Sequence, residues 1–135
     1  MILFPLSYTS FTVEQLQPVK ATLSSTYQGI NSDFRAARCI DGDTGSDHGP
    51  DGRYTICHTR NDPYPWIAID YGTTVTVQRV EIFNRRGCCG HRTRKVYVRI
   101  SDNLPTSGSQ IFSGGTLFGH FAGPATNGQD ISIEG

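Results

Sequence analysis

The sequence lacks the features that mark membrane proteins, general nucleic-acid binders and helical bundles. It contains no run of about 18 apolar residues, so we expect no membrane-spanning helix and no membrane insertion. Its 12 basic residues are balanced by 12 acidic residues, so it lacks the excess positive charge with which general nucleic-acid binders meet the phosphate backbone. A single methionine beside 15 glycines is typical of a β protein with many turns.

The length of the chain bounds its organisation. At 135 residues it predicts one domain with a core of its own, and the sequence carries no internal repeat. The first six residues are apolar but lack the basic segment of a signal peptide, so they form the stub of a signal sequence, a strand or an extended arm. We predict an N-terminal arm, or a remnant of a signal or linker, at residues 1–18 and one domain at residues 19–135.

Short alternating segments separated by turn residues make up most of the chain. Residues 75–83 and 95–100 alternate apolar and polar side chains, which is the period of a half-buried strand. One short helical turn is predicted at residues 33–40, with Ser32 or Asp33 as its N-cap. The pattern predicts an all-β sandwich or barrel. Further strands are expected at residues 20–27, 54–59, 66–70, 110–112, 116–121 and 129–134.

The segment between the two alternating strands, residues 84–92, is rich in hydrogen-bond donors. This cationic loop holds three arginines (Arg85, Arg86 and Arg92), one histidine and the adjacent pair Cys88-Cys89. Loops held between strands are common positions for binding residues. The cationic loop is therefore the candidate binding site of the chain.

The four cysteines allow three fully paired connectivities. The Cα atoms of Cys88 and Cys89 lie about 3.8 Å apart across a trans peptide, so a disulfide between them is strained. The alternatives are two reduced thiols or a metal site with His91, which the absence of a C-x-x-C pair disfavours. Cys39 and Cys57 either pair, which would stabilise the fold by about 3 kcal/mol in the chain-entropy model, or remain free buried thiols.

The donors of the cationic loop suit a ligand with several oxygen acceptors. Arg85 and Arg92 each offer a planar fork of N–H groups, and His58 offers a ring nitrogen. A sugar provides vicinal hydroxyls and one apolar face, whereas phosphate or sulfate would pair with the arginines as an anion. Solvated surface charges are the alternative for each arginine taken alone.

The spacing of these residues resembles the motif of the F-type lectins, the fucolectins that bind L-fucose on a discoidin-like β-jellyroll. Twenty-six residues separate His58 from Arg85, one residue follows, Gly87 stands where the family has aspartate, and four residues lead to Arg92. Adjacent cysteines are a further mark of the family, and Cys88-Cys89 match it. The resemblance extends from Val19 to the C-terminus, with the last strand of the domain missing or shortened. Matching segments also lie at residues 24–27, 40–43, 65–70 and 80–85.

The resemblance implies roles for individual residues in fucose binding. His58, Arg85 and Arg92 would hydrogen-bond the sugar, and a Cys88–Cys89 disulfide would pack against its ring carbons. Gly87 leaves the arginines without the family's aspartate, which would lower their preorganisation and the affinity. Candidates for an apolar pocket around the methyl group of fucose are Tyr27, Ile30, Phe34 and Tyr54.

The resemblance also implies a structural calcium ion, which takes six to eight oxygen ligands. A glutamate on the last strand would complete its shell. Either Glu134 is that glutamate, or the chain ends one strand early. Without calcium, the acidic residues would simply form turns. The remaining expected ligands are the Arg38 carbonyl, Asp41, Asp43 and Thr55.

These features predict a non-catalytic, calcium-stabilised lectin that recognises terminal L-fucose on glycans or glycoproteins and is secreted. No paired carboxylates flank the cationic loop, and no nucleophile has a base in a recognisable pattern. A single sugar site binds weakly, at roughly micromolar to millimolar Kd, so oligomers or tandem domains would supply strength. The alternative is a gamete or cell-surface recognition module of the same fold with weakened or lost fucose binding. A redox role ranks last, because Cys88-Cys89 lack the spacer of thioredoxin-like motifs.

Overall fold

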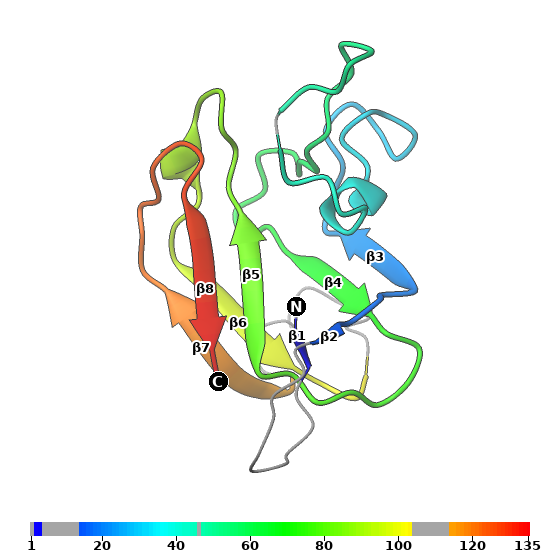
Figure 1. The fold of residues 1–135 in the computed structure, drawn as a ribbon, viewed down its shortest axis with the longest axis vertical. Coiled ribbons are helices and arrows are strands. Elements are labelled where there is room, and N and C mark those ends of the chain that lie inside the picture. The colour runs from blue at the N-terminus through cyan, green and yellow to red at the C-terminus, as the bar shows by residue number, and fades with distance from the viewer. Residues whose placement is uncertain (1, 4–13, 46, 104–113) are drawn as a thin grey trace.

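The strands form three antiparallel sheets, which Figure 1 shows in a computed structural model that describes residues 2–3, 14–45, 47–103 and 114–135. The largest has the order β2-β1-β5-β8, and the two others are the pairs β3-β4 and β6-β7. This arrangement confirms the predicted β-sandwich. The elements are β1 (Ile2–Leu3), β2 (Glu14–Gln15), β3 (Lys20–Leu23), η1 (Ala36–Cys39), β4 (Ile67–Asp70), β5 (Arg79–Phe83), η2 (Gly90–Arg92), β6 (Val96–Ile100), β7 (Thr116–Phe121) and β8 (Asp130–Glu134).

The hydrophobic core lies where the β5-β8 ladder meets β6 and β7. Strand β8 alternates as its sequence predicts: Ile131 and Ile133 are 3% and 4% exposed, whereas Ser132 between them faces solvent. The register of β5 with β8 runs from Arg79 opposite Glu134 to Phe83 opposite Asp130. Partly buried side chains that pack on this core are Ile82, Val96, Val98, Phe118 and Phe121.

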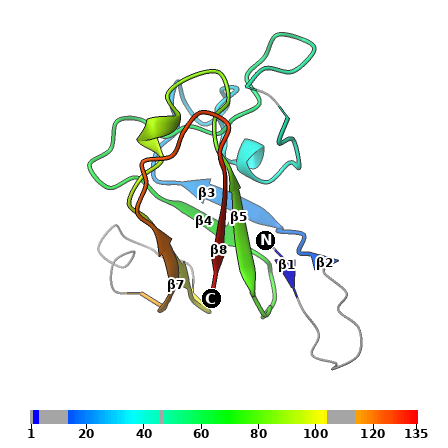
Figure 2. The ribbon, with the colours of Figure 1, turned by 60° about the vertical axis from the view of Figure 1, so that its left-hand side comes forward.

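The β3-β4 pair forms a second unit that supports η1. Figure 2 shows β3 and β4 running across the direction of β5 and β8. The disulfide between Cys39 and Cys57, with Cα atoms 5.2 Å apart, ties η1 to the segment that follows Tyr54. The pairing of these two cysteines, left open by the sequence, is therefore settled in favour of a disulfide.

Two predicted elements differ in the structure. The helical turn is shorter than expected and begins after Arg35, without a side-chain cap, because the Ser32 hydroxyl accepts a hydrogen bond from the Phe34 N–H instead. The strand predicted at residues 54–59 is wrong. The N–H groups of Thr55 and His58 donate to the Asp47 and Phe34 carbonyls, so this segment joins loops rather than a ladder.

Other boundaries follow the sequence with smaller changes. Within the alternating segment at residues 75–83, only Arg79–Phe83 belongs to a strand. The strand predicted at residues 110–112 lies outside the described residues. The division at residue 18 stays a prediction, although β1 and β2 both join the sheet of β5. Within the described part of the chain, no helix is long and apolar enough to cross a membrane.

We predict that Ile133→Ala lowers the free energy of unfolding by about 2–4 kcal/mol, because it leaves a cavity in the core of β8. Chemical denaturation measures the change. Leu117→Ala is the control, since Leu117 is 50% exposed on β7 and should cost less than about 1 kcal/mol. Equal losses in the two variants would contradict this placement of the core.

Candidate functional site

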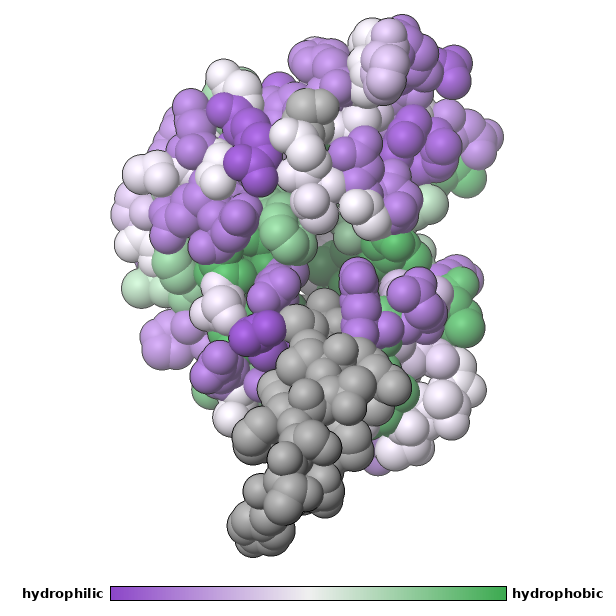
Figure 3. All heavy atoms as spheres, in the orientation of Figure 1, coloured by the Kyte–Doolittle hydropathy of each residue, from purple (hydrophilic) through white to green (hydrophobic). Residues whose placement is uncertain are grey.

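Loops from distant parts of the sequence gather at one end of the sheets. In Figure 1 the loops that carry η1 and η2 lie beyond the same end of β5. Figure 3 shows hydrophilic residues gathered over this end, above a band of hydrophobic residues that corresponds to the strands. The predicted binding residues belong to these loops, so the site is built from irregular backbone that other contacts must hold in place.

Buried Asn84, 7% exposed, anchors the base of the cationic loop. Its Nδ2 donates to the Gly90 carbonyl at 3.1 Å and to the Thr126 carbonyl at 2.9 Å. Its Oδ1 accepts from the Thr93 hydroxyl at 2.8 Å. One side chain thus ties both ends of the loop to the turn before β8, and both of its amide protons are used.

The adjacent cysteines form a disulfide, and all cysteines of the chain are paired. Cys89 has φ +64°, a left-handed conformation, and precedes η2. The next residue must be glycine, because a Cβ on Gly90 would lie 2.6 Å from the backbone of Thr126 and Asn127. The metal site with Cys88, Cys89 and His91 is wrong, since the two sulfurs are bonded to each other.

The side chain of Asp47 holds the first half of the cationic loop. It is 7% exposed and accepts three hydrogen bonds: from Arg85 Nε at 3.1 Å, Arg86 N–H at 2.8 Å and Gly87 N–H at 2.9 Å. Burial alone would raise the pKa of Asp47. The two backbone N–H donors and the Arg85 guanidinium outweigh this effect, so the pKa lies below its ordinary value.

The sequence did not identify Asp47 as a site residue, because Asp47 is one of several acidic residues in a loop rich in turn residues. It lies 38 residues before Arg85, and no local pattern joins the two. Its own carbonyl accepts from the Thr55 N–H at 2.9 Å. Asp47 therefore connects the cationic loop to the segment that leads to His58.

The predicted apolar residues gather around Phe34, which is 5% exposed. Its ring centroid lies 5.2 Å from that of Tyr27, 4.6 Å from that of Tyr54 and 5.7 Å from that of His58. The structure thus brings Tyr27, Tyr54 and His58 together around Phe34, and their roles in sugar binding stay predictions. Ile30 is 77% exposed and takes no part in these ring contacts.

Two serines hold the loop that carries Tyr27. The hydroxyls of Ser24 and Ser25 donate to Asp62 Oδ2 at 2.8 and 2.6 Å. The hydrogen bond from Ser25, followed by that from Ser24, lowers the pKa of Asp62. The Tyr27 N–H donates to the His58 carbonyl at 2.9 Å, which sets the two rings 5.1 Å apart.

Some of the cationic side chains bind other parts of the protein, whereas others keep N–H groups that a ligand can use. Arg86 is structural, because it donates to the Thr44 carbonyl at 3.2 Å and pairs with Asp130 at 3.6 Å. Arg85 is engaged through Nε, and among the described residues no hydrogen bond uses its terminal nitrogens. Arg92 is exposed on η2, and its side chain has no partner within the described ranges. His58 Nδ1 faces the Thr59 carbonyl, which leaves Nε2 for a ligand.

The residues expected to bind calcium fit that ion only in part. Asp41 and Asp43 are exposed in consecutive turns, in which each carboxylate accepts a backbone N–H. Asp41 also lies 3.7 Å from the Arg38 guanidinium, which offsets its charge. Across residues 2–3, 14–45, 47–103 and 114–135, no group of three or more His, Cys, Asp or Glu side chains is placed to hold a metal.

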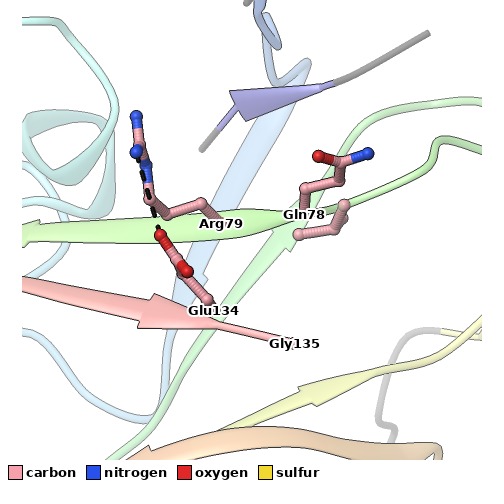
Figure 4. Close-up of a pocket in the computed structure, with 5 residues that line it drawn as sticks. Gln78, Arg79, Glu134 and Gly135 are labelled. Carbon is pink, nitrogen blue, oxygen red and sulfur yellow. Dashed lines mark ion pairs between the residues drawn. The ribbon is translucent and has the colours of Figure 1, made fainter. Parts of the chain in front are cut away.

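Glu134 does not join the other expected calcium ligands, so its assignment to that site is wrong. It pairs with Arg79 at the end of β5 that lies away from the loops, about 13 Å along the strand from Phe83. Figure 4 shows Glu134 beside a cavity of about 330 Å³ lined by Gln78, Arg79 and Gly135. This cavity contains none of the predicted sugar-binding residues, so the candidate site remains the loop surface around residues 84–92.

Comparison with known proteins supports the assignment of the fold. The family model of the NedA-like, galactose-binding domain matches residues 38–130. The chain belongs to this family. The matched region contains Asp47, Tyr54, His58 and the whole cationic loop.

Similar proteins confirm the resemblance to the F-type lectins. An F-lectin (fucolectin) from striped bass (Morone saxatilis) serum superposes with a TM-score of 0.71 at 26% identity, over 89% of this chain and 37% of that one. Fucolectin-5 of Anguilla japonica is 37% identical over 71 residues, 51% of this chain and 35% of that protein. A pentraxin fusion protein of Xenopus laevis is 28% identical over 105 residues, 78% of this chain and 24% of that protein.

The chain therefore spans only about a third or less of the length of these relatives, so the match concerns a part of each. The comparisons support a carbohydrate-binding lectin domain.

We predict that Asn84→Ala lowers the free energy of unfolding by about 2–4 kcal/mol, because the Gly90 and Thr126 carbonyls lose their donor at a buried position. Denaturation with urea measures the loss. Asn61→Ala is the control: its side chain is exposed and makes no hydrogen bond among the described residues, so we expect a loss below about 1 kcal/mol. If Asn84→Ala unfolds at the same urea concentration as the unmodified protein, Asn84 is not the anchor of the cationic loop.

Proposed function

We propose that this domain recognises terminal L-fucose on glycans and acts by binding alone, without catalysis. The observation that carries the proposal is the juxtaposition of a rigid Cys88–Cys89 disulfide with Arg85 and Arg92 in one loop of eight residues, 85–92. The disulfide offers a flat apolar surface to one face of a sugar ring. The guanidinium groups offer donors to hydroxyl and ring oxygens.

The N–H donors of Arg85 are held in one orientation, which favours a ligand whose acceptor atoms have a fixed geometry. Because Asp47 engages Arg85 through Nε, the orientation of the guanidinium plane is restricted and its terminal N–H groups remain for a ligand. Restricting a side chain before binding reduces the entropy that binding must remove. Vicinal hydroxyls of a pyranose present oxygens at such fixed spacing.

The charge of the site favours a neutral sugar over phosphate or sulfate. The Asp47 carboxylate lies 3.1 Å from Arg85 Nε, so it offsets the positive charge that an anion would need. Burial of that carboxylate strengthens the effect, because a buried charge is screened less than an exposed one. A neutral polyol needs donors rather than net charge.

The aromatic cluster of Tyr27, Phe34, Tyr54 and His58 supports the choice of fucose among neutral sugars. Fucose carries a methyl group at C6 where galactose carries a hydroxymethyl group. An apolar wall favours the methyl group, and a buried hydroxyl without a partner costs free energy. Tyr27, whose ring lies 5.1 Å from that of His58, is 44% exposed and therefore reachable by a ligand.

The proposal extends to the context in which the domain works. We infer an intrinsic Kd of roughly micromolar to millimolar for a single sugar, raised in apparent affinity by homo-oligomers or tandem domains. The striped bass lectin comes from serum, and both disulfides of this chain suit an oxidising compartment. We therefore propose a secreted, extracellular lectin whose partners are fucosylated glycans or glycoproteins.

We predict that Arg92→Ala weakens binding to L-fucose by about tenfold to a hundredfold, because charged hydrogen bonds to the sugar are lost. Titration calorimetry with L-fucose and with D-galactose measures the change and the selectivity. Arg94→Ala is the matched control, since Arg94 is exposed two residues further on and should leave binding unchanged. Fucose binding that survives the loss of Arg92 would overturn the assignment.

A calcium ion that stabilises the loops is a separate part of the proposal. Support comes from the exposed carboxylates of Asp41 and Asp43, which lie within one short turn region. With the Arg38 and Thr55 carbonyls they would supply four oxygens, and water would supply the rest. Glu134 takes no part, because it lies at the opposite end of β8.

We predict that about 10 mM calcium raises Tm relative to a chelator, as a weak extracellular-type site requires. Asp43→Asn should abolish that rise, whereas Glu134→Gln should leave it unchanged. Differential scanning calorimetry of the three proteins provides the measurement. A rise that depends on Glu134, or no rise in the unmodified protein, would exclude the site described above.

A further inference from the structure

Gly87 and Asp47 compete for the same space beside Arg85. A Cβ built on Gly87 would lie 2.8 Å from Asp47 Oδ2 and 3.5 Å from Asp47 Cγ. The same Oδ2 atom accepts the hydrogen bonds of Arg85 Nε and of the Gly87 N–H. A side chain at position 87 would therefore point into the position that the Asp47 carboxylate already occupies.

We infer that Asp47 is the positioning residue of the sugar site: it orients Arg85 and closes the turn at residues 85–87 with a carboxylate supplied from a separate loop. Position 87 is where the motif of the resembling lectins has an aspartate, and Gly87 provides no side chain there. The inference rests on the proposed function, because it concerns how Arg85 is held for a sugar.

The geometry explains why the two positions exclude each other. An aspartate at position 87 in the present chain would bring a second carboxylate into near contact with the buried carboxylate of Asp47, and like charges repel strongly where water screens them little. With Asp47 absent, a carboxylate on the Cβ of position 87 would lie within reach of Arg85 Nε. A carboxylate at position 47 or at position 87 would therefore hold Arg85, but there is space for only one of the two.

Because Asp47 and Arg85 belong to different loops, the orientation of Arg85 depends on how these loops pack together. Asp47 also binds the Thr55 N–H through its carbonyl, and Thr55 lies three residues before His58. Arg85 is therefore oriented only when the segment that carries Tyr54 and His58 has docked against the cationic loop. An aspartate within the cationic loop would orient Arg85 without that docking.

The test compares four proteins in binding to L-fucose: the unmodified chain, Asp47→Ala, Gly87→Asp and the double variant Asp47→Ala/Gly87→Asp. We expect each single variant to weaken binding by about tenfold or more, and the double variant to recover most of the loss. A double variant that binds no better than Asp47→Ala would overturn the interchange. An Asp47→Ala variant that binds like the unmodified chain would overturn the positioning role.

A spectroscopic readout separates positioning from general damage to the fold. The Nε–H resonance of Arg85 should exchange slowly with water in the unmodified chain, quickly in Asp47→Ala and slowly again in the double variant. If the unmodified chain binds no fucose, the proposed function fails, and this resonance still decides whether Asp47 holds Arg85. Equal exchange in all four proteins would overturn the inference on its own.

Matched variants control for folding and for loss of charge. Asp51→Ala removes an exposed aspartate of the same loop that binds only the Arg53 N–H among the described residues, and it should change neither readout. If Asp47→Ala does not fold, Asp47→Asn keeps the volume and one acceptor while removing the charge, and it should still speed the exchange of Arg85 Nε–H. Slow exchange in a folded Asp47→Asn would count against the inference.

Discussion

The candidate site depends on one buried carboxylate. Asp47 accepts hydrogen bonds from Arg85 and from the N–H groups of Arg86 and Gly87, and its carbonyl receives the Thr55 N–H. The segments that it joins have irregular backbone and receive no support there from a strand ladder. The position of the donors therefore follows from a few side-chain contacts between loops that lie far apart in the sequence.

The other loops at this end of the sheets are also held by polar contacts and disulfides rather than by a large hydrophobic core. Among the described residues, the buried hydrophobic side chains are only Phe34, Ala125, Ile131 and Ile133. Asn84 binds the Gly90 carbonyl in the cationic loop and the Thr126 carbonyl in the turn before β8, and the Cys39–Cys57 disulfide fixes η1. A small core contributes little excess stability, so the loss of one buried hydrogen-bond hub is expected to matter more here than in a larger domain.

The arrangement also reconciles a cationic loop with a neutral ligand. Arg86 is used within the protein, and Arg85 is partly neutralised by Asp47. The positive charge counted in the sequence is thus larger than the charge available to a ligand. Directed N–H donors beside an apolar disulfide suit a sugar, which has polar edges and an apolar face. Preorganisation of this kind limits the entropic cost of binding at a shallow surface.

The sequence by itself determined the features that depend on residues close together along the chain. Alternation placed β5, β6 and β8 closely, because the two faces of a strand differ in burial every second residue. The spacing of His58, Arg85 and Arg92, together with the adjacent cysteines, was sufficient to identify the lectin family. Only the tertiary structure decided what depends on distant partners. It placed Asp47 at Arg85, joined Cys39 to Cys57, turned the segment after Tyr54 into a loop and put Glu134 at the far end of β8. The physical reason is that a carboxylate has the same local pattern whether it caps a turn, binds an ion or holds an arginine, and only packing selects its partner.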